Sequence, residues 1–187
     1  MGLWQRALVI DWGNIRKPGN VKLIIGLLFG DNEVFGKAKS LLERKFGRID
    51  FESETIEFVH TDYYAKEMGR NLKRKFLGFE KLLNLNKIYK VKIVTNSIEE
   101  KLLKHGKRTV NIDPGYLDMS KLVLFSTKDY SHRIHIDKGI FGEVTLFFKD
   151  GSYRAWEWTY PDYKTKIYID IFNNIRENHK KEIGGVN

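Results

Sequence analysis

The chain has 187 residues, 33 of them basic and 24 acidic, which gives a formal net charge of +9 and an apolar fraction of 42%. This length suits one domain with a core, and the charge favours an anionic partner such as nucleic acid, a nucleotide or anionic lipid. The absence of cysteine excludes disulfides, Cys-ligated zinc, iron–sulfur clusters and cysteine nucleophiles.

The chain contains no apolar run of the roughly 18 residues that a membrane span requires. The short run Ala7–Ile10 is followed by Asp11 and does not match a signal peptide. We therefore expect a cytoplasmic protein with no membrane partner. The abundance of lysine and glutamate is also typical of a heat-adapted, thermostable protein.

The first elements are predicted from apolar spacing. Residues 1–20 are expected to form a leader segment, ahead of a single domain at 21–187. The almost wholly apolar Val21–Phe29 is typical of a buried central strand. A helix is predicted at Glu33–Phe46, because apolar side chains recur there at helical spacing, Asp31 or Asn32 can cap it, and Gly47 ends it.

The middle of the chain is less regular. Ile49–Phe58 alternates and predicts a strand, and Thr61–Gly69 predicts a turn or a single helical turn. Asn71–Leu83 fits either a helix or a strand, and we favour a strand through Phe79. A helix is expected within Leu85–His105.

Turn signals divide Thr109–Asp162 into an antiparallel meander. Asp150-Gly151 is a strong two-residue hairpin signal, and Asp137-Lys138-Gly139 fits a three-residue loop with glycine at a positive φ. Lys128–Ser131 is a third turn. The predicted strands are Lys121–Thr127, His132–Ile136, Ile140–Lys149 and Ser152–Tyr160, and an amphipathic helix follows at Lys164–Lys181.

The order of these elements predicts an α+β fold. Its first part reads as a ferredoxin-like β-α-β-β-α-β half. An antiparallel β-meander and a C-terminal helix extend that half.

The two hairpin turns imply a register for the meander. Ile136 would lie opposite Ile140, which places Arg133 opposite Glu143, and the other turn places Glu143 opposite Trp158. The predicted core face carries Ile134, Ile136, Val144, Leu146, Phe148 and Ala155. The opposite face carries Arg133, His135, Phe141, Glu143, Thr145, Trp156, Trp158 and Tyr160. Arg133 and Glu143 are then either a structural cross-strand pair or part of a partly open pocket, with Asp113, Lys128 and Tyr160 near its rim.

Three polar clusters are further candidates. Thr61–Tyr64 contains Asp62 and Tyr63 and is either a capped turn or part of a site. Asn111–Tyr116 contains an Asp113-Pro114-Gly115 turn signal, so that Asp113 would be a carboxylate on a rigid turn, near Lys121 and Lys128. The third cluster is basic and lies next to Phe76 and Phe79, which suits either nucleic-acid binding or a solvated edge strand. Its members are Arg70, Lys73, Arg74 and Lys75.

Two segments resemble known binding motifs, a phosphate-binding loop and a two-histidine metal site, but each lacks a feature that the motif requires. Gly30–Ala38 follows a strand and opens a helix, but it has five residues between its glycines, and Ala38 replaces the magnesium-binding hydroxyl of a phosphate loop. His132 and His135 would point to opposite faces of a strand, so they are not expected to share a zinc ion.

Several polar strings resemble an uncharacterised bacterial family known only as a domain of unknown function (number 4416). The resemblance covers about Pro18 to the end of the chain and implies no activity. The strings are Lys22–Phe29, Thr61–Gly69, Asn111–Leu117, Lys128–Ile134, Gly142–Leu146 and Trp158–Tyr163.

These observations leave three functional hypotheses. The first is a module that binds a phosphate-bearing ligand, a nucleotide or RNA, through a basic and aromatic face. Its candidate residues are Asp62, Tyr63, Arg74, Tyr116, Arg133, Trp158, Tyr160 and Asp162. The second is an enzyme, a metal-assisted or acid–base hydrolase or transferase, for which a divalent metal is left open. Its candidate residues are Asp113, Lys121, Lys128, His132 and Glu143. The third is a scaffold protein with no ligand. The oligomeric state is left open.

Overall fold

The computed structural model describes residues 17–59 and 64–184. Its helices are α1 (Asn32–Phe46), α2 (Ala65–Met68), α3 (Lys90–Lys101) and α4 (Lys166–Gly184), with a 3-10 turn η1 (Asp162–Lys164). Its strands are β1 (Lys22–Phe29), β2 (Ile49–Glu52), β3 (Ile56–Glu57), β4 (Lys73–Phe79), β5 (Val110–Leu117), β6 (Lys121–Ser126), β7 (Ile134–Asp137), β8 (Ile140–Lys149) and β9 (Ser152–Ala155). The protein is therefore α+β, as predicted. Most of the predicted leader, residues 1–16, lies outside the described residues.

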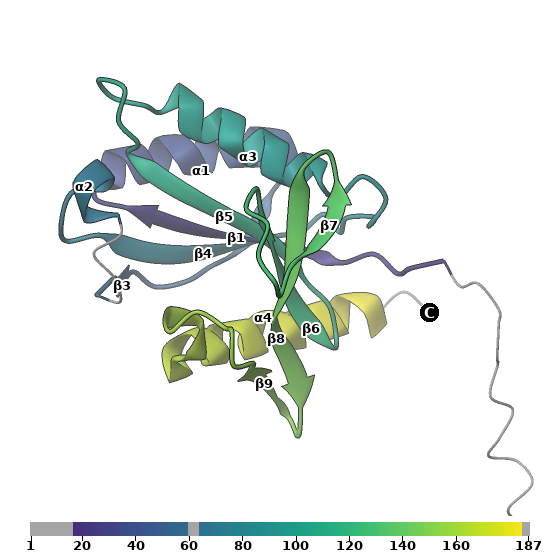
Figure 1. Cartoon of the computed structure of the whole chain (residues 1–187). Coiled ribbons are helices and arrows are strands. Elements are labelled where there is room, and N and C mark those ends of the chain that lie inside the picture. The colour runs from purple at the N-terminus through teal and green to yellow at the C-terminus, as the bar shows by residue number, and fades with distance from the viewer. Residues whose placement is uncertain (1–16, 60–63, 185–187) are drawn as a thin grey trace, which may run out of the picture.

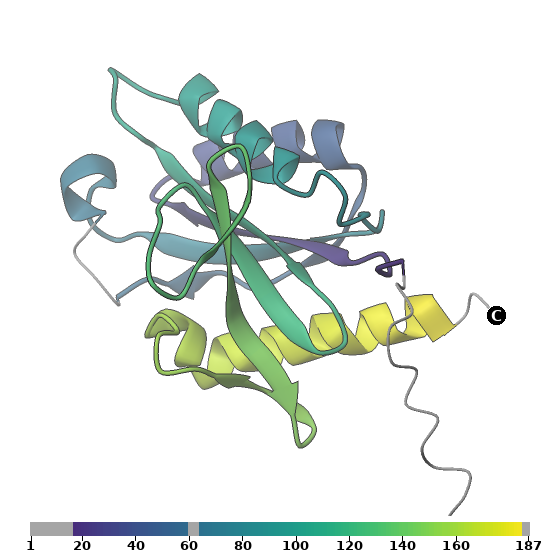
Figure 2. The ribbon, with the colours of Figure 1, turned by 45° about the vertical axis from the view of Figure 1, so that its right-hand side comes forward.

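Within the described residues the strands form one nine-stranded sheet in the order β2-β4-β1-β5-β6-β8-β7. The strand β3 also pairs with β4, and β9 also pairs with β8. Figure 1 shows α1 and α3 together on one face of the sheet and α4 on the other. The turned view of Figure 2 shows the long β8 running from the side of α1 and α3 toward α4. None of the described helices is long and apolar enough to cross a membrane.

The helix α1 begins and ends where its sequence predicts. The Asp31 side chain accepts a hydrogen bond from the backbone N–H of Glu33 at 2.8 Å, which satisfies one of the free donors of the first turn. Gly47 ends the helix with a φ of 97°, a backbone conformation that residues other than glycine rarely adopt. The predicted cap and stop are both confirmed.

The strand β1 is the centre of the protein because both of its faces are buried. Alternate residues, such as Leu23 and Ile25, pack against α1 and α3 in one core. Ile24 points the other way, into a second core with Phe76 and Phe172, a residue of α4. The almost wholly apolar sequence of β1 is the pattern expected of a strand covered on both sides.

The predicted tight turn at Asp113-Pro114-Gly115 is wrong, because these residues lie inside β5 and pair with β1. Pro114 lacks an N–H, and β6 pairs with β5 only from Gly115 onward. A Cβ on Gly115 would lie 2.2 Å from the carbonyl oxygen of Val123. Glycine therefore serves close packing of the backbones here rather than a turn.

Both hairpin turns of the meander form, but one loop is shorter than predicted. Lys138 and Gly139, with φ of 49° and 73°, make a two-residue turn, so that Asp137 and not Ile136 lies opposite Ile140. Ile136 becomes an irregularity in the ladder. At the other turn, Lys149 faces Ser152 as predicted.

The predicted core face of the meander is split by tertiary structure. Ile134 is 76% exposed and Ile136 is 36% exposed, because both lie on β7, the last strand in the sheet order. In β8 the pairing with β6 shifts between Val144 and Leu146, which leaves Thr145 as an extra residue. Val144 then packs in the core of α1 and α3, whereas Leu146 packs in the core of α4.

Two predicted strands are shorter than their alternation suggested. The strand predicted at Ser152–Tyr160 ends at Ala155, because the backbone N–H of Trp156 donates to the Thr159 hydroxyl at 2.9 Å and the chain turns. The strand predicted at Ile49–Phe58 is interrupted, because the Ser53 hydroxyl accepts the N–H of Phe76 at 2.9 Å. In both places a side-chain hydroxyl accepts a backbone N–H in place of a ladder carbonyl.

Candidate functional site

The hairpin of β7 and β8 brings Arg133 and Glu143 together, as the predicted register required. The Nε of Arg133 donates to Oε2 of Glu143 at 2.8 Å, and the two side chains are only 4% and 2% exposed. Burial alone would lower the pKa of Arg133, but the hydrogen bond and the charge of Glu143 outweigh burial and raise it. The Thr145 hydroxyl donates to the other carboxylate oxygen at 3.3 Å.

Both terminal nitrogens of Arg133 also have partners. One terminal nitrogen donates to the Ser126 hydroxyl at 2.9 Å and to the Lys128 carbonyl at 3.0 Å. The other donates to the hydroxyl of Tyr160 at 3.0 Å. Arg133 thereby ties three segments together and has little capacity left for a phosphate group.

An aromatic row runs beside this pair. In order, its members are Phe147, Trp156, Trp158, His132 and Tyr130. The rings of Trp156 and Trp158 are stacked with centroids 5.1 Å apart and planes 9° apart. His132 stacks on Trp158 at 6.2 Å and 17°. Trp156, Trp158 and Tyr130 remain 37%, 43% and 49% exposed. Separations of this size indicate offset rings, which leave part of each face uncovered.

The segment that carries Trp158 also provides hydrogen bonds to a part of β8 that has no neighbouring strand on this edge within the described residues. The strand β8 pairs with β7 through Gly142 and with β9 from Leu146, so the residues between them lack a ladder partner on this edge. The indole nitrogen of Trp158 donates to the Val144 carbonyl at 3.3 Å, and the Thr159 hydroxyl donates to the Thr145 carbonyl at 2.6 Å. Side chains therefore replace the missing strand.

A second cluster surrounds Arg74 on β4, whose side chain is 3% exposed. One of its terminal nitrogens donates to Oδ2 of Asp113 on β5 at 2.8 Å, and the other lies 3.7 Å from Asp162 on η1. Asn111 donates to the second oxygen of Asp113 at 2.8 Å. A Cβ on Gly26 of β1 would lie 3.1 Å from the guanidinium, so the absence of a side chain there makes room for it.

The charges of this Arg74 cluster are mutually stabilising. Burial alone would raise the pKa of Asp113, but the charges of Arg74 and Lys92 and the hydrogen bonds to Asp113 outweigh burial and hold its pKa below the usual value. Burial raises the pKa of Tyr168 to about 12, and it also raises the pKa of Tyr163 well above its usual value. Within the described part of the chain, both of these buried hydroxyls and Nε of Arg74 lack an aligned hydrogen-bond partner.

The remaining predicted site residues are dispersed. Lys121 donates to the Asp118 carboxylate at 2.6 Å in the turn between β5 and β6, away from both clusters. Tyr116 packs against Phe125 in the core of α1 and α3, and burial raises its pKa to about 12. Lys128 contributes its backbone carbonyl to Arg133. Asp62 and Tyr63 lie outside the described residues.

The basic run on β4 does not form an exposed strip, because β4 lies between β1 and β2 and is not an edge strand. Arg74 is buried, and Lys75 pairs with Glu52.

Sequence reasoning missed a third buried charge cluster. Lys22 is 1% exposed, pairs with Asp50, and pairs with Glu182 of α4 at 2.6 Å. A lysine at the start of an otherwise apolar strand was the signal that could have revealed it.

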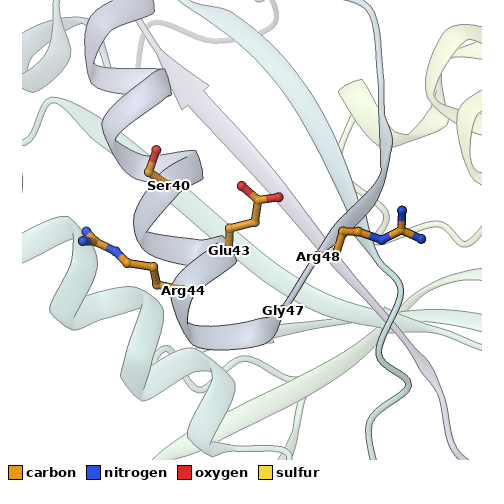
Figure 3. A pocket seen from close by; sticks show the side chains of 5 residues that line it. All are labelled: Ser40, Glu43, Arg44, Gly47 and Arg48. Atoms are coloured by element: carbon orange, nitrogen blue, oxygen red, sulfur yellow. The ribbon is translucent and has the colours of Figure 1, made fainter.

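Surface depressions lie away from these clusters. Figure 3 shows one at the C-terminal end of α1, with Glu43 between Arg44 and Arg48. A second depression lies between α1 and the end of α3, where Lys37, Arg44 and Leu102 are among its lining residues. Neither is lined by a predicted site residue. Searching residues 17–59 and 64–184 found no group of three or more His, Asp or Glu side chains arranged to hold a metal ion.

One protein-family model matches the chain. It is described as Domain of unknown function (DUF4416) and matches residues 19–179, which include both clusters and the aromatic row. Comparisons with curated proteins and with solved structures each gave no match.

Proposed function

The chain belongs to the DUF4416 family, as its polar strings predicted, and from its own geometry we propose that it binds a phosphate-bearing ligand, a nucleotide or RNA. The observation that carries this proposal is the aromatic row, which we propose as the site where bases stack. For the fold we propose a ferredoxin-like first half. The strand order β2-β4-β1-β5, with α1 and α3 on one face, supports that description.

The exposure of the row supports a binding role. The hydrogen bond to β8 accounts for the indole nitrogen of Trp158, but it does not account for the exposed rings of Trp156 and Tyr130. Large exposed aromatic surfaces commonly mark binding sites. Bases stack on aromatic side chains with a gain of about 1–3 kcal/mol per base, whatever the base.

The charges around the row point to stacking as the source of affinity. The segment from Lys128 to Lys164 contains six basic and six acidic residues. Arg133 is committed to Glu143 and to its other partners. The base is therefore the part of the ligand that this face holds.

The enzyme hypothesis is less well supported. Asp113 pairs with Arg74 and Lys121 pairs with Asp118, so the candidates do not gather at one point. His132 and Glu143 are adjacent, with Nε2 of the histidine 3.2 Å from Oε2 of the carboxylate. That nitrogen is buried and lacks hydrogen-bond alignment, so it is poorly placed to exchange a proton with a substrate.

The test is a titration of the full chain with oligouridine and with single nucleotides, followed by tryptophan fluorescence and calorimetry. We expect Trp158→Phe, which keeps a ring but loses area, to bind more weakly, and Trp156→Ala to lose about 5–150-fold in affinity, the equivalent of one stacked base. Ile167→Ala, which changes an exposed side chain on α4, is the matched control and should bind normally. Normal binding by Trp156→Ala, or no binding by the wild-type chain, would refute the proposal.

A further inference from the structure

Much of the basic surplus of the chain lies in one segment, which consists of α3 and the stretches on either side of it. The segment from Lys81 to Arg108, which contains α3, has eight basic residues and two acidic ones. This segment therefore has a net charge of +6, whereas the whole chain has a net charge of +9. The segment that carries the aromatic row is balanced, so the two surfaces differ in kind.

One lysine of this segment, Lys92, is buried and donates to the Ile112 carbonyl at 3.0 Å, but most of the others are exposed. Lys87, Lys90, Lys101, Lys104 and Lys107 are all exposed, and none has a carboxylate within 4.0 Å among residues 17–59 and 64–184. Ion-pair networks are the usual contribution of lysine to thermal stability. These lysines form no such network, so heat adaptation does not explain them.

The positions of these lysines also do not stabilise α3. Lys87 and Lys90 lie at the N-terminus of α3, where the helix dipole repels positive charge by about 0.3–1 kcal/mol. The first turn contains no acidic residue, and Tyr89 at the cap position provides no side-chain hydrogen bond. Only Lys101, in the last turn, suits the dipole. Helix stability therefore does not account for this pattern.

The lysines form an elongated track. Lys90 and Lys101 are eleven residues apart on one helix, which corresponds to about 16 Å, and Lys104 continues the row past its end. Arg44 extends the surface toward α1, because it lines a depression together with Leu102. Figure 3 shows its side chain pointing away from Arg48.

We infer that this lysine track on α3 binds the sugar–phosphate backbone of a single-stranded nucleic acid. The inference rests on the proposed function for the identity of the ligand, and it selects a strand over a single nucleotide. Lysine contacts phosphate as a point charge, and a row of such charges tracks a backbone. The track contains only two large exposed apolar side chains, Ile93 and Leu103, which is too little for a membrane-inserting face or for the apolar centre of a protein interface.

The test compares two triple variants of equal charge. Lys90, Lys101 and Lys104 are changed to alanine in one variant, and Lys166, Lys180 and Lys181, exposed residues of α4, in the other. Affinity for a 16-nucleotide oligouridine is measured between 50 and 200 mM salt. If each lysine of the track neutralises one phosphate of a single strand, the α3 variant should reduce the slope of log affinity against log salt by about 2. Melting curves check that alanine, a good helix former, leaves the fold intact.

The outcomes separate this inference from the proposed function. A shallower slope for the α3 variant alone supports the lysine track, and Trp156→Ala should then weaken binding at every salt concentration without changing the slope. Equal effects of the two triple variants, or no effect of either, overturn the lysine track while leaving the aromatic row standing. So does binding of uridine monophosphate as tight as that of the strand. Lysine-dependent binding to anionic phosphatidylserine vesicles without binding to oligouridine overturns both.

Discussion

The Arg133–Glu143 pair allows a quantitative prediction for Glu143→Gln. The two side chains are 4% and 2% exposed, so this is a buried pair rather than part of an open pocket. Removing one partner leaves the other charge buried, which costs roughly 3–5 kcal/mol. Arg133 keeps its hydrogen bonds to Ser126, Lys128 and Tyr160, so we expect the lower part of that range. For a chain of this size, a loss of about 3–4 kcal/mol should lower the melting temperature by roughly 6–16 °C.

The assay is urea unfolding at pH 7 followed by circular dichroism, which gives the free energy of unfolding directly. Glu33→Gln is the control, because Glu33 pairs with Lys37 on the surface with side chains 71% and 61% exposed. Such an exposed pair contributes about 0–1 kcal/mol. If Glu143→Gln lost no more stability than Glu33→Gln, the reasoning from burial would be refuted. A double-mutant cycle with Arg133→Gln should show a coupling energy well above that of the surface pair.

Three further predictions concern other parts of the fold. The lowered pKa of Asp113 means that its stabilising contribution is present above its ordinary 3.8 and is lost as pH falls through the folded value; Asp113→Asn should therefore flatten the acid limb of a stability-against-pH curve, and an unchanged limb would contradict this. Gly115→Ala should destabilise the protein by about 1–3 kcal/mol or more, since its Cβ would meet the Val123 carbonyl. Gly36→Ala should stabilise it by about 0.5–1 kcal/mol, because Gly36 is an interior residue of α1 and a Cβ there would have no atom within 4 Å. Thermal unfolding that ranked the two variants in reverse would be inconsistent with the packing. Asp31→Ala should cost about 0.5–2 kcal/mol through the lost helix cap, and Asp31→Asn, which keeps an accepting oxygen, should restore most of it in the same measurement.

Local patterns predicted one half of the candidate site and not the other. Arg133 and Glu143 were paired correctly, although the loop between them has two residues and not three. The shorter loop alone would have shifted the pairing by one residue. The irregularity at Ile136, which was not predicted either, shifts it back, so the register before Arg133 is the predicted one. The grouping of Arg74 with Asp113 and Asp162 could not be predicted, since three segments distant in sequence meet there.

The sequence by itself determined the features that depend on a few neighbouring residues. Asp31 caps α1, and Asp150-Gly151 turns with positive φ at both positions, because short polar side chains and glycine make those conformations accessible. Tertiary structure decided which face each meander residue occupies. The extra residue at Thr145 inverts the alternation. Tertiary structure also placed Asp113-Pro114-Gly115 in a central strand. Pairing with β1 provides the backbone hydrogen bonds that a local turn would otherwise have provided.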